Sequence, residues 1–446
     1  MAKRRSKRQQ AIIRRRIFIC SALAVILALL VGIFCLVGNI IKVLNKEDIS
    51  GIGTSSKDNP SSSQTTTEPY VVSSAKVVNT GDILVHSTVL DGAKTGSGEY
   101  DFSAFFGSVS SYFKESDLAV INLEVALGGT AAKYSGYPVF NTPDSLADVM
   151  KSAGINLVLT SNNHCYDMGL SGLKRTASVL KSKNLDFIGT KEKESDPSYL
   201  VKNVNGIKIG ITNFTYSTMS SSGVLSINGR NVASEGNSLI NTFCYNNLNT
   251  FYSQAEQMIA DMKKDGAEAI VFYMHWGNEY QLKQNTYQDT ISQKLCNLGV
   301  DIIVGGHPHV IQPMKLLHSE DSQNTSVCIY STGNAISNQR QELMDSCPSG
   351  HTEDGVLFYY TFDKYNNGDV VLSGVDVIPT WVNKYKGGSG YQYTMYPLET
   401  ANSGAALGLD ATASKKAAAS YERTKAILAA GLTECQTALG CDVRFK

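Results

Sequence analysis

Imidazole, carboxylate and amide side chains recur just after apolar, strand-like runs of this sequence. Five of the seven histidines occur in short motifs of this kind: His86, His164, His275, His307 and His309. Two carboxylates and one amide also follow such apolar runs: Asp82, Glu124 and Asn163. Loops beyond strand ends are where α/β folds place their functional sites. Donors of these three types together suit Mn, Fe or Zn rather than Ca.

Each of these residues also has an ordinary structural explanation when it is considered alone. A single Asp after a strand usually caps a turn, and a single buried His is more often a hydrogen-bonded core group than a ligand. Five strand ends that each deliver a donor group favour a metal site instead. His86 stays a candidate only, because about 13 Å of extended strand would separate it from Asp82.

The segments between these motifs alternate between strand-like and helix-like patterns. Strands are predicted over residues 77–85, 118–122, 156–160, 207–212, 269–273, 301–304 and 327–330. Apolar stripes predict helices within residues 146–153, 170–180, 251–262 and 287–298. A β-hairpin is predicted from 356–362 and 370–378, and an Ala-rich helix over 411–440. The alternation predicts an α/β fold of sheets flanked by helices.

The first 46 residues differ physically from the rest of the chain. They hold ten Lys or Arg and no Asp or Glu, so the other 400 residues carry 30 basic against 40 acidic side chains. An acidic body argues against nucleic acid as a partner. Residues 17–41 are uncharged and long enough to span a lipid bilayer. The eight basic residues before this run then place the N-terminus in the cytoplasm and the body outside.

We therefore predict a single-pass protein of the cell membrane with five parts. These are a basic cytoplasmic tail (1–16), a transmembrane anchor (17–41), a Ser/Thr-rich linker (42–75), a main domain (76–400) and an Ala-rich helical tail (401–446). A cleaved signal peptide is the alternative for the apolar run, although its apolar region is usually only about 7–15 residues long. The tail lies beyond the chemical motifs, so we expect truncation after about Leu398 to spare the metal site. Cys435 and Cys441 are the pair most suited to a disulfide.

Six motifs, in order along the chain, resemble those of the CapA family of capsule and poly-γ-glutamate biosynthesis proteins. They are Gly81-Asp82, Asn122–Glu124, Asn162–Gly169, His275–Tyr280, Gly306–Pro313 and Tyr330–Asn334. Proteins of this family resemble the calcineurin-like metallophosphatases, and the resemblance covers about residues 76–380. It implies a two-sheet β-sandwich flanked by helices, with one or two divalent transition metals (Mn, Fe or Zn) at one edge.

The resemblance also implies a role for each motif residue. The implied metal ligands are Asp82, Glu124, Asn163, His275, His307 and His309, with Glu124 as the bridging carboxylate. His164 would protonate a leaving oxygen, and Asp167 would orient its imidazole. Two departures from the metallophosphatase pattern bear on whether two metals bind. Asp82 is followed by Ile83-Leu84 instead of a histidine two residues on, and Glu124 replaces the usual Asp.

The substrate side of the site and its activity remain open at this point. Trp276, Glu279, Tyr280 and Gln312 are predicted substrate-binding groups, with packing of the fold as an equal alternative. One function is a metal-dependent hydrolase outside the membrane, acting on a phosphate ester or an anionic polymer. The other is a non-catalytic component that binds an anionic polymer, polyglutamate or another capsule polymer, beside membrane synthase subunits. The acidic body disfavours polyanion binding unless a metal or local Lys and Arg residues supply positive charge.

Overall fold

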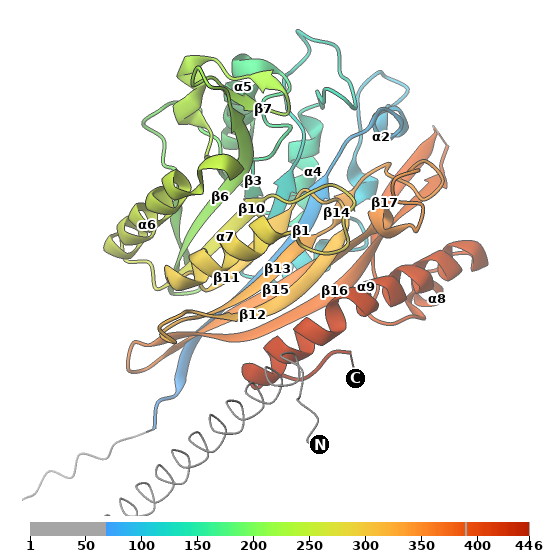
Figure 1. Cartoon of the computed structure of the whole chain (residues 1–446). Coiled ribbons are helices and arrows are strands. Elements are labelled where there is room, and N and C mark those ends of the chain that lie inside the picture. The colour runs from blue at the N-terminus through green and yellow to red at the C-terminus, as the bar shows by residue number, and fades with distance from the viewer. Residues whose placement is uncertain (1–67, 389, 446) are drawn as a thin grey trace, which may run out of the picture. The chain divides into compact units, whose positions relative to one another are not determined.

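The computed structural model describes residues 68–388 and 390–445. They form two mixed β-sheets flanked by helices (Figure 1). The predicted cytoplasmic tail, anchor and most of the linker lie outside the described residues. Among the helices that are described, none combines the length and the apolar character needed to cross a bilayer.

The first sheet has eight strands in the order β17-β16-β15-β1-β2-β3-β4, with β14 paired to β1. Strands β1 to β4 are parallel to one another, and β15 to β17 extend the sheet in antiparallel fashion. Their bounds are β1 (Val71–Ile83), β2 (Leu118–Leu123), β3 (Leu157–Leu159), β4 (Asp186–Ile188), β14 (Asn334–Ile336), β15 (Asp354–Tyr365), β16 (Val370–Lys386) and β17 (Tyr391–Pro397). The predicted hairpin is confirmed as β15 and β16.

The second sheet has nine strands in the order β12-β13-β11-β10-β6-β7-β8, with β5 and β9 paired to β6. Strands β6, β10, β11 and β13 form its parallel centre. The bounds are β5 (Leu200–Val204), β6 (Ile207–Met219), β7 (Leu225–Ile227), β8 (Arg230–Asn231), β9 (Thr242–Cys244), β10 (Ala269–His275), β11 (Ile302–Gly306), β12 (Ile311–His318) and β13 (Thr325–Thr332).

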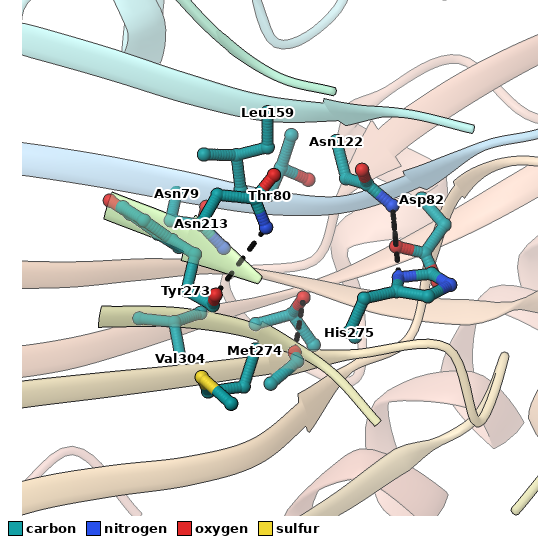
Figure 2. Close-up of a pocket in the computed structure, with 13 residues that line it drawn as sticks. Asn79, Thr80, Asp82, Asn122, Leu159, Asn213, Tyr273, Met274, His275 and Val304 are labelled. Atoms are coloured by element: carbon teal, nitrogen blue, oxygen red, sulfur yellow. Dashed lines mark hydrogen bonds between the residues drawn. The ribbon is translucent and has the colours of Figure 1, made fainter. Parts of the chain in front are cut away.

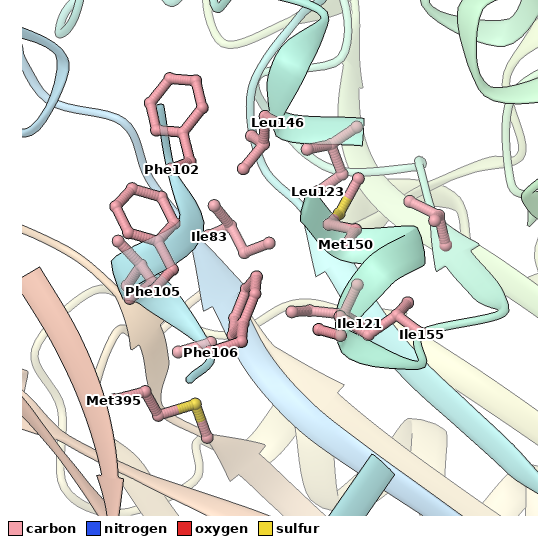
Figure 3. Close-up of a cluster of buried hydrophobic side chains, with 14 of the residues drawn as sticks. Ile83, Phe102, Phe105, Phe106, Ile121, Leu123, Leu146, Met150, Ile155 and Met395 are labelled. Carbon is pink, nitrogen blue, oxygen red and sulfur yellow. The ribbon is translucent and has the colours of Figure 1, made fainter. Parts of the chain in front are cut away.

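The central strands β2, β10 and β11 are almost entirely apolar because both of their faces are buried. One core lies between the sheets, where Val77 and Val120 pack in the same cluster as Ile209 and Val271. A second core covers the outer face of the first sheet, and Figure 3 shows part of it, with Phe102, Phe105 and Met150 around Ile83 and Ile121. A third covers the outer face of the second sheet.

The helices cover the outer faces of the two sheets. The four predicted helices are present as α4 (Ser145–Ala153), α5 (Gly169–Ser182), α6 (Leu248–Lys264) and α7 (Thr286–Asn297). Helix α4 ends at Gly154, whose φ of 103° is in the left-handed region that favours glycine. The shorter helices are α2 (Ser87–Ala93), α3 (Ser110–Lys114) and α8 (Ser403–Ala406), with single 3₁₀ turns at 103–105, 234–239, 245–247 and 351–353.

The N-terminal strand starts before the predicted domain boundary at residue 76. Strand β1 begins at Val71, and Ser73 to Ala75 pair with β15 in register. Ala75 is fully buried between the sheets. The sequence predicts a linker here because Ser and Thr dominate this stretch. Main-chain hydrogen bonds place these residues in the sheet instead, and such bonds do not depend on the side chains.

The Ala-rich tail forms a single helix that belongs to the core. Helix α9 (Ala411–Ala438) lies along β12 and β16 (Figure 1). Leu428 and Leu432 are fully buried in the core between the sheets. A Cβ added at Gly431 would lie 2.0 Å from the Met314 carbonyl oxygen, so the helix backbone approaches β12 directly. The tail is therefore packed in the core, and the expectation that truncation after about Leu398 spares the metal site stays a prediction.

The disulfide expected between Cys435 and Cys441 is absent. Both thiols are free. Cys435 faces the core from the last turn of α9, whereas the Cys441 sulfur lies 3.2 Å from the Ser373 carbonyl oxygen. The helix holds the two side chains against different neighbours, so their short separation in sequence does not bring the sulfurs together.

Shortening a core side chain of α9 is expected to destabilise the whole body. Leu432→Ala should lower the free energy of unfolding by about 2–5 kcal/mol, because a fully buried leucine leaves a cavity behind. Thr437→Ala, an exposed position of the same helix, should change it by less than about 0.5 kcal/mol. Denaturant unfolding followed by circular dichroism measures both, and equal stabilities of the two variants would show that the tail does not pack as described.

Candidate metal centre

The predicted ligands lie at the carboxyl ends of parallel strands from both sheets. Asp82 is near the end of β1, and Glu124 directly follows β2. His275 ends β10, and the His307-Pro308-His309 loop follows β11. Because parallel strands all finish at the same edge of a sheet, side chains far apart in sequence meet here. All of these ligands are buried.

Two groups of three side chains place one potential ligand atom each within 4.8 Å of one another: Asp82, Glu124 and His275, and Glu124, His307 and His309. Glu124 belongs to both groups. Its Oε1 lies 3.5 Å from His275 Nε2 and 3.7 Å from His309 Nε2. The geometry therefore places one carboxylate between two sets of donors, as a bridging ligand requires.

The remaining metal-type residue predicted from the sequence, Asn163, also lies in this cluster. Its Oδ1 is 2.7 Å from His275 Nε2. His309 Nδ1 is 3.4 Å from Asp82 Oδ2, which links the two groups a second time. The structure thus brings together all six residues that the sequence nominated as ligands.

Several buried polar atoms of the cluster have no hydrogen-bond partner among the described residues. They are both carboxylate oxygens of Glu124, Nδ1 of His307 and Nδ1 of His309. An unpartnered buried carboxylate is very costly, and such charges are normally paired or bound to a metal. A divalent cation would satisfy these atoms together, so the residues present fit a metal. Carboxylate and imidazole donors suit Mn, Fe or Zn.

The electrostatics of the cluster favour the neutral form of two of its imidazoles, those of His275 and His307. Burial, followed by the charges of His275 and His309, holds the pKa of His307 well below its usual value. Burial also lowers the pKa of His275 to about 3. The neutral ring is the form that binds metals. Burial and the neighbouring Asp82 raise the pKa of Glu124 well above its usual range, a shift that a bound cation would oppose.

The His-Pro-His loop has an uncommon backbone conformation. His307 has a φ of 95° and His309 a φ of 56°, both in the left-handed region that residues other than glycine rarely adopt. The Asp82 carboxylate accepts a hydrogen bond from the His307 N–H at 3.1 Å and helps to hold this turn. Strained residues of this kind cluster at functional sites.

His164 and Asp167 form a pair beside the ligands. His164 Nδ1 lies 2.8 Å from Asp167 Oδ2, and the Phe140 N–H donates to the same oxygen at 2.7 Å. The Phe140 ring packs edge-on against the imidazole, with ring centres 4.7 Å apart. The imidazole is therefore fixed through one nitrogen, which leaves the other available for proton transfer.

Residues 76–339 match the model of a family described as "Bacterial capsule synthesis protein PGA_cap". The chain belongs to this family. It is 29% identical over 311 residues to the capsule biosynthesis protein CapA of Bacillus anthracis, an alignment that covers 67% of this chain and 65% of that protein. It is 27% identical over 234 residues to the PGA biosynthesis protein CapA of Bacillus subtilis (strain 168), covering 51% and 53%.

The chain thus spans less than two thirds of the length of either curated relative. The matches confirm the resemblance to CapA proteins found in the motifs. They also cover every residue of the candidate metal centre, because the family match extends from β1 to just past β14.

Two asparagines in the PGA_cap motifs orient the predicted ligands, although the sequence analysis assigned them no role. Asn122 Nδ2 donates to Asp82 Oδ1 at 2.8 Å and lies 3.5 Å from His275 Nδ1 (Figure 2). Asn162 Nδ2 in turn donates to Asn122 Oδ1 at 3.1 Å and to the Leu123 carbonyl at 2.8 Å. Asp82, Asn122 and His275 also line a cavity of about 20 Å³ between the sheets, and Figure 2 labels all three residues. Their places inside the Asn122–Glu124 and Asn162–Gly169 motifs were the available signal.

His86 lies next to the candidate metal centre but belongs to neither of the two ligand groups. Its Nδ1 accepts a hydrogen bond from the Asn338 N–H at 3.2 Å. Its ring packs edge-on against Phe140, on which His164 also packs. The contacts assign His86 to the wall of the site, beside the His164 pair.

Two of the four predicted substrate-binding residues pack in the protein interior instead. Trp276 is fully buried, and its Nε1 donates to the Tyr330 carbonyl at 2.9 Å. Gln312 is fully buried too, donating to the Gln281 carbonyl at 2.7 Å and accepting from Gln288. Neither side chain has surface left for a substrate, because each lies in the packed interior under α7.

The other two predicted substrate-binding residues lie at the margin of the centre. Glu279 is exposed, and Tyr280 is half-buried with its ring centre 6.2 Å from that of His309. Tyr216, which the sequence did not single out, packs against His307 with ring centres 4.8 Å apart. It lies in the middle of a long strand, β6, so no motif marked it.

Proposed function

We propose that this chain is a membrane-anchored, extracytoplasmic protein of capsule or poly-γ-glutamate biosynthesis or export, with a metal-dependent hydrolase site of the phosphoesterase type. The observation that carries the proposal is Glu124, which is shared by both ligand groups and has both carboxylate oxygens unpartnered. The membership of the PGA_cap family supports the biological setting. The names of the two CapA relatives, which refer to capsule biosynthesis and PGA biosynthesis, support it further.

The ligand residues would hold one or two divalent transition metals, Mn, Fe or Zn. When bound, such an ion supplies Lewis-acid polarisation of an oxyanion substrate and an activated water at neutral pH. Asp82, Glu124, Asn163, His275, His307 and His309 would provide the donor atoms. Asn122 and Asn162 would hold Asp82 in place through the hydrogen bonds described above.

His164 is the proposed general acid of the reaction. Its contact with Asp167 fixes the orientation of the ring. The buried Phe140 ring excludes water from one side of the imidazole. The pair would deliver a proton to the leaving oxygen of a phosphate ester.

Metal content of the wild type is the direct test of this proposal. The full-length chain, purified in detergent without chelator and supplied with Mn²⁺, Fe²⁺ or Zn²⁺, should retain about one or two ions per molecule by mass spectrometry. A protein that retains no metal would contradict the site. A protein that retains metal but hydrolyses no ester or amide would favour a non-catalytic role in binding an anionic polymer beside membrane synthase subunits.

The proposed location predicts the outcome of proteolysis on intact cells. With residues 17–41 in the bilayer and the body outside, added protease should release a soluble fragment by cutting before Val71, where β1 begins. Immunoblotting of the supernatant detects the fragment, and a cytoplasmic marker protein should stay intact as a control. Release of the fragment only after cell lysis would mean that the orientation is reversed.

A further inference from the structure

The margin of the candidate metal centre combines aromatic rings with one exposed carboxylate. Tyr216 packs on His307 and Tyr280 on His309, while the two histidine rings lie 5.9 Å apart. Glu279 precedes Tyr280 in the chain and is exposed. The two tyrosine rings therefore lie against the histidines of the centre, and the exposed carboxylate is on the residue next to one of them.

The backbone holds Glu279 and Tyr280 in this place. The Tyr280 N–H donates to the Pro308 carbonyl at 2.8 Å, which ties this loop to the His-Pro-His loop. Tyr280 has a φ of 64°, in the left-handed region, and its hydroxyl accepts a hydrogen bond from Gln339 Nε2 at 3.2 Å. Tyr216 is supported from behind by stacking on Tyr245, with ring centres 6.2 Å apart.

The charge of Glu279 acts on the surrounding groups. After burial, it is the largest cause that raises the pKa of the Tyr216 and Tyr280 phenols, and it contributes to the raised pKa of Glu124. Apart from burial, the pKa values of Asp82, His275 and His307 are shifted by neighbouring imidazoles and, for His275, also by Asp82. An anionic group that bound beyond the metals would therefore face a negative charge, whereas a cationic group would be attracted.

We propose that Glu279, with the rings of Tyr216 and Tyr280, binds a primary ammonium group of the substrate beside the metal centre. A carboxylate next to aromatic faces is the arrangement that recognises ammonium ions, through charge and cation–π attraction. The inference rests on the proposed function, since the metals would hold the oxyanion of the same molecule. The substrate class is then an amine-bearing oxyanion, such as an amine-terminated chain end, and the carboxylate-rich interior of a polyanion is disfavoured.

Matched pairs of phosphonates test the ammonium site by binding alone. In 2-aminoethyl and propyl phosphonate, and in 3-aminopropyl and butyl phosphonate, an ammonium replaces a methyl group. Titration calorimetry on the full-length, Mn²⁺-loaded chain in detergent measures the affinity for each compound. In at least one of the two pairs, the aminoalkyl phosphonate should bind about tenfold more tightly than the alkyl phosphonate of the same size. Glu279→Gln should abolish this preference without weakening the alkyl phosphonates, and Glu279→Asp should restore part of it.

Glu256→Gln, an exposed glutamate on α6, is the matched control and should leave the preference unchanged. Equal affinities for both members of each pair in the wild type would overturn the ammonium site while leaving the metal centre intact. A preference that survives Glu279→Gln would overturn the assignment to Glu279. No binding of any phosphonate by metal-loaded protein would overturn the oxyanion role of the centre, and the ammonium site with it.

Discussion

Glu124→Gln is expected to lower the metal affinity of both ligand groups at once, by more than about 100-fold. Loss of a residue that merely supports a ligand already costs about 10- to 100-fold in affinity, and Glu124 is itself shared by both groups. The amide keeps the size of the side chain but offers one neutral oxygen where the carboxylate offers two. Mass spectrometry of the purified variant measures the metal directly.

Thermal unfolding gives a second readout of the same substitution. Metal at about 100 times its dissociation constant should stabilise the wild type by about 2.7 kcal/mol, and the variant should gain almost nothing. His307→Ala should lower the metal content as well, since an imidazole ligand is lost. His318→Ala, an exposed histidine at the end of β12, is the control and should keep both metal and stabilisation. Undiminished metal in Glu124→Gln would show that the carboxylate is not a ligand.

His164→Ala is expected to separate chemistry from metal binding. The variant should keep its metal and lose about 10²- to 10⁴-fold in turnover of an activated phosphodiester, the usual contribution of a positioned acid. The reason is geometric: His164 contacts Asp167 and Phe140, and it lies outside both ligand groups. Hydrolysis of bis(4-nitrophenyl) phosphate, measured beside metal content, makes the comparison.

Asp167→Asn is the matched variant for this prediction. Its amide oxygen can still accept the Phe140 N–H, so the fold of the loop should be preserved. The rate should fall less than in His164→Ala, because the imidazole remains but loses the carboxylate that orients it. Loss of metal from His164→Ala would instead identify the imidazole as a ligand, and an unchanged rate would exclude it as the acid.

The two predictions together separate the proposed hydrolase from a non-catalytic polymer-binding protein. If the metal has only a structural or binding role, Glu124→Gln should still lose metal as expected. In that case the wild type should hydrolyse no phosphodiester, so His164→Ala would have no rate to lower. The membership of the PGA_cap family fits either role, because fold and family do not fix the reaction.

The sequence determined the kind of site and the elements that carry it. Apolar runs followed by Asp82, Glu124, Asn163, His275 or His307 predicted that these side chains lie close together, and the structure brings them together because the carboxyl ends of parallel strands meet at one edge. The helices over 146–153 and 251–262 and the hairpin after residue 355 followed from local periodicity and turn residues, which depend only on near neighbours in sequence.

Only the tertiary structure decided which polar residues face the site and which face the core. Trp276 and Glu279 belong to one short motif, yet the indole donates to Tyr330 in the interior while the carboxylate is exposed. The burial of α9, the free Cys435 thiol and the position of Tyr216 against His307 likewise depend on contacts between distant segments. Spacing along the chain fixes side-chain direction within one element, but burial and partners are set by how the two sheets and their helices pack together.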